Sequence, residues 1–171
     1  MLHARFRTRL VLGAGAAVLA AATALAMPQA QDGDAALKGI TVMGVVVEEL
    51  GSQSVSCGMS KDAIEQVVTK IVADAGVKVT KLSDEDTYLY VNVGSVSTPD
   101  RLCVTRYDVT LNTHTTAKMA YSKDPALVEV TLLRGGGLAS GPVAGHADQV
   151  MKNITQNTEA LMSHVRAANA R

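Results

Sequence analysis

Apolar and polar residues alternate with a period of two in the central part of this 171-residue chain, as in strands with one covered face. Residues 88–96 read YLYVNVGSV, and the alternation returns over residues 102–116 and 127–134. We expect each of these segments to be a strand. Residues 38–49 are mostly apolar and rich in Val, so they predict an interior strand.

Two other segments repeat their apolar residues at helical spacing. Residues 60–75 begin at Ser60, a favoured N-cap residue, and end before Gly76, a favoured residue after a helix. A longer helix is expected from about Val143. Its apolar stripe, interrupted at Asn157 and Thr158, consists of Val143, Ala147, Val150, Met151, Ile154, Leu161, Met162 and Val165.

The remaining segments carry the residues of loops and turns. Residues 51–58 (GSQSVSCG) predict a loop of small residues, and residues 83–86 (SDED) predict an acidic turn. Residues 77–82 predict a short strand. The three glycines at 135–137 predict a break in the chain between the last strand and the last helix.

This order of elements, β-α-β-β-β-α, predicts an α+β fold. We expect a two-layer sandwich with one mainly antiparallel sheet and both helices on one face, because each helix has one apolar stripe to cover. Residues 39–171 form this single domain. Residues 27–38 predict a flexible leader, being polar with Pro, Gly and two Asp.

The first 26 residues have the three parts of a secretory signal peptide. Arg5, Arg7 and Arg9 precede an apolar run from Leu10, which ends in small residues at Ala26. We expect cleavage after Ala26, with a cut after Ala30 as the alternative. An uncleaved signal would be the chain's only membrane anchor. This address predicts general secretory export to a bacterial periplasm or beyond.

Cys57 and Cys103 are the two cysteines of the chain. In an oxidising compartment an even count favours a disulfide, which would stabilise the fold by roughly 4 kcal/mol in the chain-entropy treatment. Two buried free thiols are the alternative.

Charge and composition argue against nucleic acid as a partner. Without the three arginines of the signal, the chain keeps 13 basic and 16 acidic residues, a net charge of −3. The negative net charge argues against the basic surface of a nucleic-acid binder. Aromatic residues make up only 3%, so few side chains are available to stack on bases.

The chain resembles a group of small secreted bacterial proteins without a known activity. The resemblance rests on Cys57-Gly58 before the first helix, the strand YLYVNV at residues 88–93, and Cys103 at the start of the next strand. It covers roughly residues 40–115. It implies a disulfide-stapled α+β fold and no particular activity.

No motif in the sequence predicts catalysis, a cofactor or a metal. The glycine run at 134–141 departs from the dinucleotide template at Ser140 and lacks the lysine of a phosphate-binding loop. His146 and His164 fall on one helix face about 27 Å apart, too far to share a metal. His114 is expected to be a solvated polar residue.

The outward side of the sheet is the most informative surface, because Tyr side chains favour recognition. We expect this side to expose a set of mainly polar residues. The candidate binding residues are Tyr88, Tyr90, Asn92, Arg106, Asp108, Thr110 and Asn112, and Glu129 and Thr131 lie beside them. The sequence therefore favours a non-catalytic binding module for a protein partner or envelope component. A homo-oligomeric envelope subunit and a hydrolase with a dispersed site are the alternatives.

Overall fold

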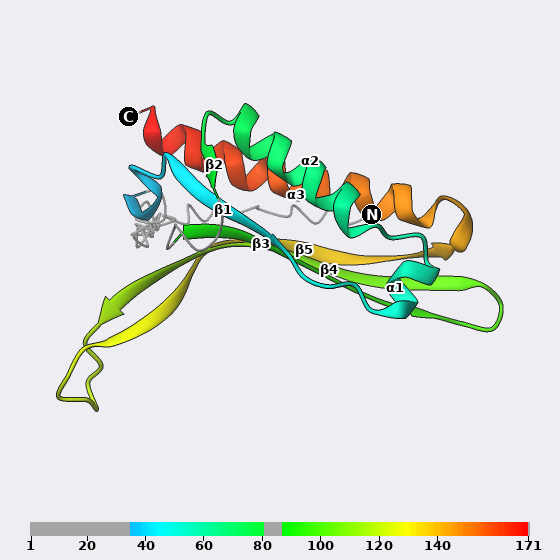
Figure 1. The fold of residues 1–171 in the computed structure, drawn as a ribbon, viewed down its shortest axis with the longest axis horizontal. Helices are drawn as coiled ribbons and strands as arrows, with labels where there is room; N and C mark the ends of the chain where they lie inside the picture. The colour runs from blue at the N-terminus through cyan, green and yellow to red at the C-terminus, as the bar shows by residue number, and fades with distance from the viewer. Residues whose placement is uncertain (1–34, 81–86, 171) are drawn as a thin grey trace, which may run out of the picture.

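The computed structural model describes residues 35–80 and 87–170 (Figure 1). The predicted signal peptide and the acidic turn at 83–86 lie outside the described residues. Among the helices of the described part, none is both long and apolar enough to cross a membrane.

One five-stranded sheet organises the fold, in the order β2-β1-β3-β4-β5. The strands are β1 (Val42–Val47), β2 (Lys78–Thr80), β3 (Thr87–Ser97), β4 (Leu102–Ala117) and β5 (Ala126–Pro142). β1 is parallel to both of its neighbours, whereas β3, β4 and β5 form an antiparallel meander. The predicted α+β fold is confirmed, and the sheet is mixed.

The two long helices lie together on one side of this sheet (Figure 1). Helix α2 (Lys61–Asp74) packs against β1 and β2, and α3 (Val143–Asn169) packs against β4 and β5. Ser60 caps α2 as predicted, because its hydroxyl accepts a hydrogen bond from the Ala63 amide at 3.3 Å.

The core lies between the helices and the sheet, and the apolar stripes of both long helices contribute to it. Helix α2 buries Ile64, Val68 and Val72 in the core, where this helix contacts β1, β2 and α3. Helix α3 does not lose its stripe in the middle. Thr158 is fully buried, because its hydroxyl donates to the Ile154 carbonyl at 2.8 Å and so needs no water.

The predicted disulfide between Cys57 and Cys103 is confirmed. Its sulfur atoms are 2.05 Å apart and both cysteines are fully buried. The bond joins the segment before α2 to the start of β4. It therefore locks the helical layer to the sheet across 46 residues of sequence.

The expected loop at residues 51–58 is wrong in part, because it contains the short helix α1 (Ser52–Ser56). Buried Ser54 fixes this helix to β3. Its hydroxyl donates to the Val93 carbonyl at 3.4 Å and accepts from the Ser95 amide at 3.0 Å. These tertiary bonds, which local sequence does not reveal, favour the helix.

The expected chain break at the three glycines is also wrong, since β5 continues through them to Pro142. These positions have no room for side chains. A Cβ on Gly135 would lie 2.5 Å from Asn157 Oδ1 on α3, and one on Gly136 would lie 2.6 Å from the Tyr107 carbonyl oxygen. The glycines therefore permit close packing of the strand.

Residues 35–37, which fall in the predicted leader at 27–38, already take part in the fold. Residues Ala35–Leu37 form a 3₁₀ turn, η1, and Leu37 is fully buried in the core. Asn169 at the end of α3 holds the next residues. It accepts from the Gly39 amide at 2.8 Å and donates to the Ile40 carbonyl at 2.9 Å.

Candidate binding face

The sheet surface of β3, β4 and β5 that points away from α2 and α3 carries the predicted polar residues; we call it the open face. The β3–β4 register places Tyr88 opposite Asn112, Tyr90 opposite Thr110, and Asn92 opposite Asp108. Arg106 is opposite Gly94. The period-two pattern thus brought all seven predicted residues to one surface.

A hollow of about 420 Å³ lies on the open face. Its walls come from all three strands of the meander. They are formed by Tyr90, Asn92, Arg106, Asp108, Thr110, Asn112, Glu129, Thr131 and Arg134.

Arg134 joins the hollow because of a β-bulge. Leu111 pairs with Leu133 but Asn112 pairs with Thr131, so Leu132 is an extra residue in β5. The extra residue reverses the alternation, and Arg134 comes to the same side as Glu129. Strict alternation along 127–134 would have turned Arg134 toward the helices, which is why the sequence did not assign it to this face.

Asp108 holds two guanidinium groups at one end of the hollow. Its carboxylate lies 2.8 Å from Arg106 and 3.2 Å from Arg134. The Asp108 side chain is 17% exposed, while the two arginines are about two-thirds exposed at 65% and 64%. Pairs this exposed contribute little to stability, and their main effect is to orient the two guanidinium groups.

Tyr88 lies near the Glu129 end of the hollow. We expected this side chain to be exposed, but it is buried. Its hydroxyl donates to Glu129, and its ring stacks on His114 with centroids 5.6 Å apart. Burial first, and then the hydrogen bond and charge of Glu129, raise the pKa of the Tyr88 phenol above its ordinary value, partly opposed by Asn112. Tyr88 is therefore covered by its neighbours on the open face and does not line the hollow.

Asn112 is also nearly covered, with 5% of its surface exposed. Its Nδ2 donates to the Thr110 hydroxyl at 3.1 Å. Its Oδ1 is buried and accepts no hydrogen bond from any of the described residues. Such an atom costs free energy unless something donates to it.

An apolar patch adjoins the hollow on the same face, and the sequence analysis missed it. Val96 pairs with Val104, and Leu138 pairs with Arg106. Val96 is 56% exposed and Leu138 is 72% exposed. The available signal was that Val96 and Val104 occupy polar-side positions of their alternating strands.

His114 and His146 lie on opposite sides of the sheet and do not form one site. His114 lies on the open face with Nε2 3.7 Å from Glu129. His146 is buried on the helix side, where Nε2 is 2.7 Å from the Thr105 hydroxyl. The sheet separates them. Among residues 35–80 and 87–170, no group of three or more His, Cys, Asp or Glu is placed to hold a metal.

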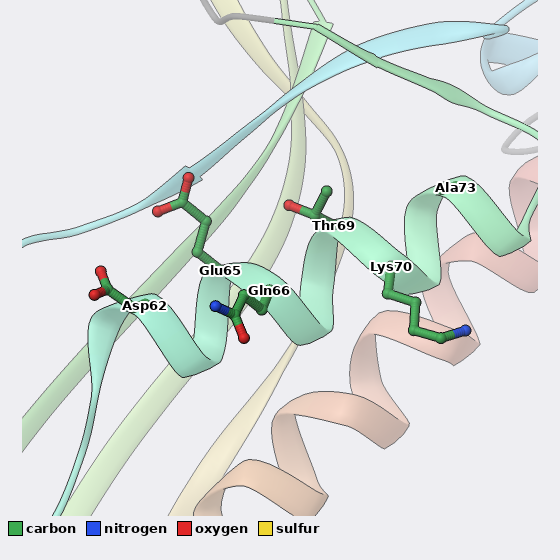
Figure 2. A pocket seen from close by; sticks show the side chains of 6 residues that line it. All are labelled: Asp62, Glu65, Gln66, Thr69, Lys70 and Ala73. Atoms are coloured by element: carbon green, nitrogen blue, oxygen red, sulfur yellow. The ribbon is translucent and has the colours of Figure 1, made fainter.

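Another hollow, of about 500 Å³, lies on the outer side of α2 (Figure 2). All of its lining residues come from this helix at spacings of three and four. They are Asp62, Glu65, Gln66, Thr69, Lys70 and Ala73. This is the solvated side of an amphipathic helix, and within the described residues no second element lines the hollow.

No family model matches the chain, and no curated protein is significantly similar to it. The open face therefore has to be interpreted from its own geometry.

Proposed function

We propose that the protein is an exported, non-catalytic binding module that contacts a protein partner or an envelope component through the open face. The observation behind this proposal is the hollow on the open face, where Asp108 forms ion pairs with Arg106 and Arg134. It lies on hydrogen-bonded strands whose other side is packed against the core, so its groups are held in place before a ligand arrives.

Export is the second part of the proposal and rests on two features. The first 26 residues have the pattern of a signal peptide, and the only two cysteines form a buried disulfide. Disulfides persist in oxidising compartments and are rare in the cytoplasm. A periplasmic or secreted location accounts for both.

Capture from an envelope extract tests the binding role. Tyr90 lines the hollow and is only partly buried, so Tyr90→Ala is expected to abolish capture of the bound component with little loss of thermal stability. Tyr121→Ala is the matched control, because Tyr121 is 89% exposed and lies outside the hollow. Unchanged capture by the Tyr90 variant would overturn the proposal.

A homo-oligomer through β5 is the second candidate, and one observation favours it. β5 is an edge strand of the described sheet, and residues 135–141 (GGGLASG) contain only small residues apart from exposed Leu138. Antiparallel pairing with a second copy, centred on Leu138, would set Gly135 opposite Gly141 without a clash of side chains. The apolar stripe of α3 is already used in the core.

Light scattering on the purified protein tests this candidate. The expected result is a dimer that Leu138→Asp converts to a monomer, because the substitution places two carboxylates at the two-fold axis. A wild-type monomer at high concentration would remove the candidate and leave the open-face proposal intact.

A further inference from the structure

The hollow on the open face balances positive and negative charges. Arg106 and Arg134 supply two positive groups, and Asp108 and Glu129 supply two negative ones. Each charge already lies near an opposite charge or a phenol donor. A charged ligand placed over either end would therefore meet repulsion as well as attraction, which favours a ligand without net charge.

Between the charged ends, the hollow is lined with hydroxyl and amide groups. The hydroxyls of Tyr90, Thr110 and Thr131 can each donate and accept, and Asn92 adds a complete amide. Each arginine has five N–H donors, and only one of its guanidinium nitrogens pairs with Asp108. Both arginines therefore keep donors for a ligand. A ligand that fits must offer donors and acceptors together at several positions.

Asn112 lines the hollow with a side chain that is nearly covered. Its Oδ1 is an acceptor without a donor among the described residues, in a side chain that lines the hollow and is 5% exposed. Its Nδ2 is fixed by Thr110, so the amide cannot turn freely to correct this. This oxygen is itself covered, so a ligand in the hollow reaches the exposed hydroxyl and guanidinium groups around Asn112 instead.

Tyr90 supplies an apolar surface within the same hollow. Its hydroxyl lies 3.5 Å from Asn92 Nδ2, which leaves the ring to contact a ligand from β3. Sugars combine hydroxyl edges with apolar C–H faces, and an amphipathic tyrosine ring suits such a face.

We infer that the hollow binds a neutral saccharide. This inference rests on the proposed function and narrows its ligand class. The saccharide's hydroxyls take hydrogen bonds from Arg106 and Arg134 and exchange one with the Thr131 hydroxyl, while a ring face packs on Tyr90. Free sugars and glycan chains of the envelope share this chemistry.

Amide NMR titration of the purified protein tests the inference with defined probes. The neutral probes are maltotriose, cellotriose, mannotriose and N,N′,N″-triacetylchitotriose, and the charged ones are trigalacturonate and tetralysine. At least one neutral trisaccharide is expected to shift the amides of Asn92, Thr110, Asn112 and Thr131 in a saturable way.

Isosteric variants show whether the hydroxyl contacts are direct. Thr131→Val is expected to weaken the binding trisaccharide roughly tenfold, the loss of about one hydrogen bond. Thr116→Val is the matched control, since Thr116 is exposed on β4 and lies outside the hollow.

Three results would overturn the saccharide inference: titration by none of the neutral probes, titration by a charged probe alone, or equal affinity of the Thr131 and Thr116 variants. Capture that depends on Tyr90 would survive these results, so failure of the ligand class is distinguishable from failure of the binding face.

Discussion

The hydroxyl of Thr105 lies 2.7 Å from Nε2 of His146, and this pair joins β4 to the first turns of α3 on the helix side of the sheet. Thr105 is fully buried and His146 is 3% exposed. The Thr105 hydroxyl also lies 2.7 Å from Ser95 Oγ on β3. Three elements thus meet at one buried hydroxyl.

Thr105→Val is predicted to destabilise the protein by about 1–3 kcal/mol, because it leaves the buried His146 nitrogen without its partner. Thr105→Ser, which keeps the hydroxyl, is expected to recover much of that loss. Urea unfolding measures both, with exposed Thr115→Val as the control. Equal stability of the Thr105 and Thr115 valine variants would contradict the pairing.

Gly136→Ala is predicted to cost about 1–3 kcal/mol, because the new methyl would lie 2.6 Å from the Tyr107 carbonyl oxygen, a backbone atom with little freedom to move. Gly94→Ala is the matched control, since a Cβ there meets nothing within 4 Å. Thermal unfolding of both variants checks this. If the two substitutions have the same effect, the packing of β5 against β4 is not as described.

Replacing both Cys57 and Cys103 by Ala is predicted to lower the free energy of unfolding by about 4 kcal/mol, for a bond that spans 46 residues. Reduction of the wild type should lower its stability to a similar level. The unreduced protein is expected to show no thiol that alkylates. Two titratable thiols in the protein isolated from its native compartment would argue against export as well as the bond.

Tyr88 predicts a loss of stability at alkaline pH. The pKa of its phenol is raised in the folded protein, mainly by burial and then by Glu129. The associated stabilisation is complete below the unfolded pKa of about 10 and is lost as pH rises through the folded pKa. Wild-type stability should therefore fall above about pH 10 more steeply than that of Tyr88→Phe.

Chemical denaturation at several pH values between about 8 and 11 follows this difference. Tyr121→Phe, at an exposed position, is expected to track the wild type. If Tyr88→Phe loses stability with pH as steeply as the wild type, Glu129 and burial do not act on Tyr88 as argued.

The local sequence pattern was sufficient to predict on which side of the sheet each residue of β3 and β4 lies. Alternation depends only on strand geometry, so Tyr90, Asn92 and Thr110 could be assigned to one face before any fold was known. The stripes of α2 and α3 were equally readable, since helical spacing is also local.

Features that depend on a distant neighbour were not predictable. The bulge at Leu132 arises in pairing with β4, and it alone brings Arg134 to the open face. The glycines of β5 are required by the close approach of Tyr107 and Asn157. Tyr88 is covered where it contacts Glu129 on β5. One sequence without its fold gives no sign of these contacts.

Site-specific photo-crosslinking in the exporting cell tests the open face most directly. A benzoylphenylalanine at Thr131 would lie in the hollow, and one at Gln66 would lie on the solvated side of α2 as the control. A specific adduct from position 131 and none from position 66 is the predicted result. Equal adducts from both positions, or adducts from position 66 alone, would contradict the open face as the binding surface.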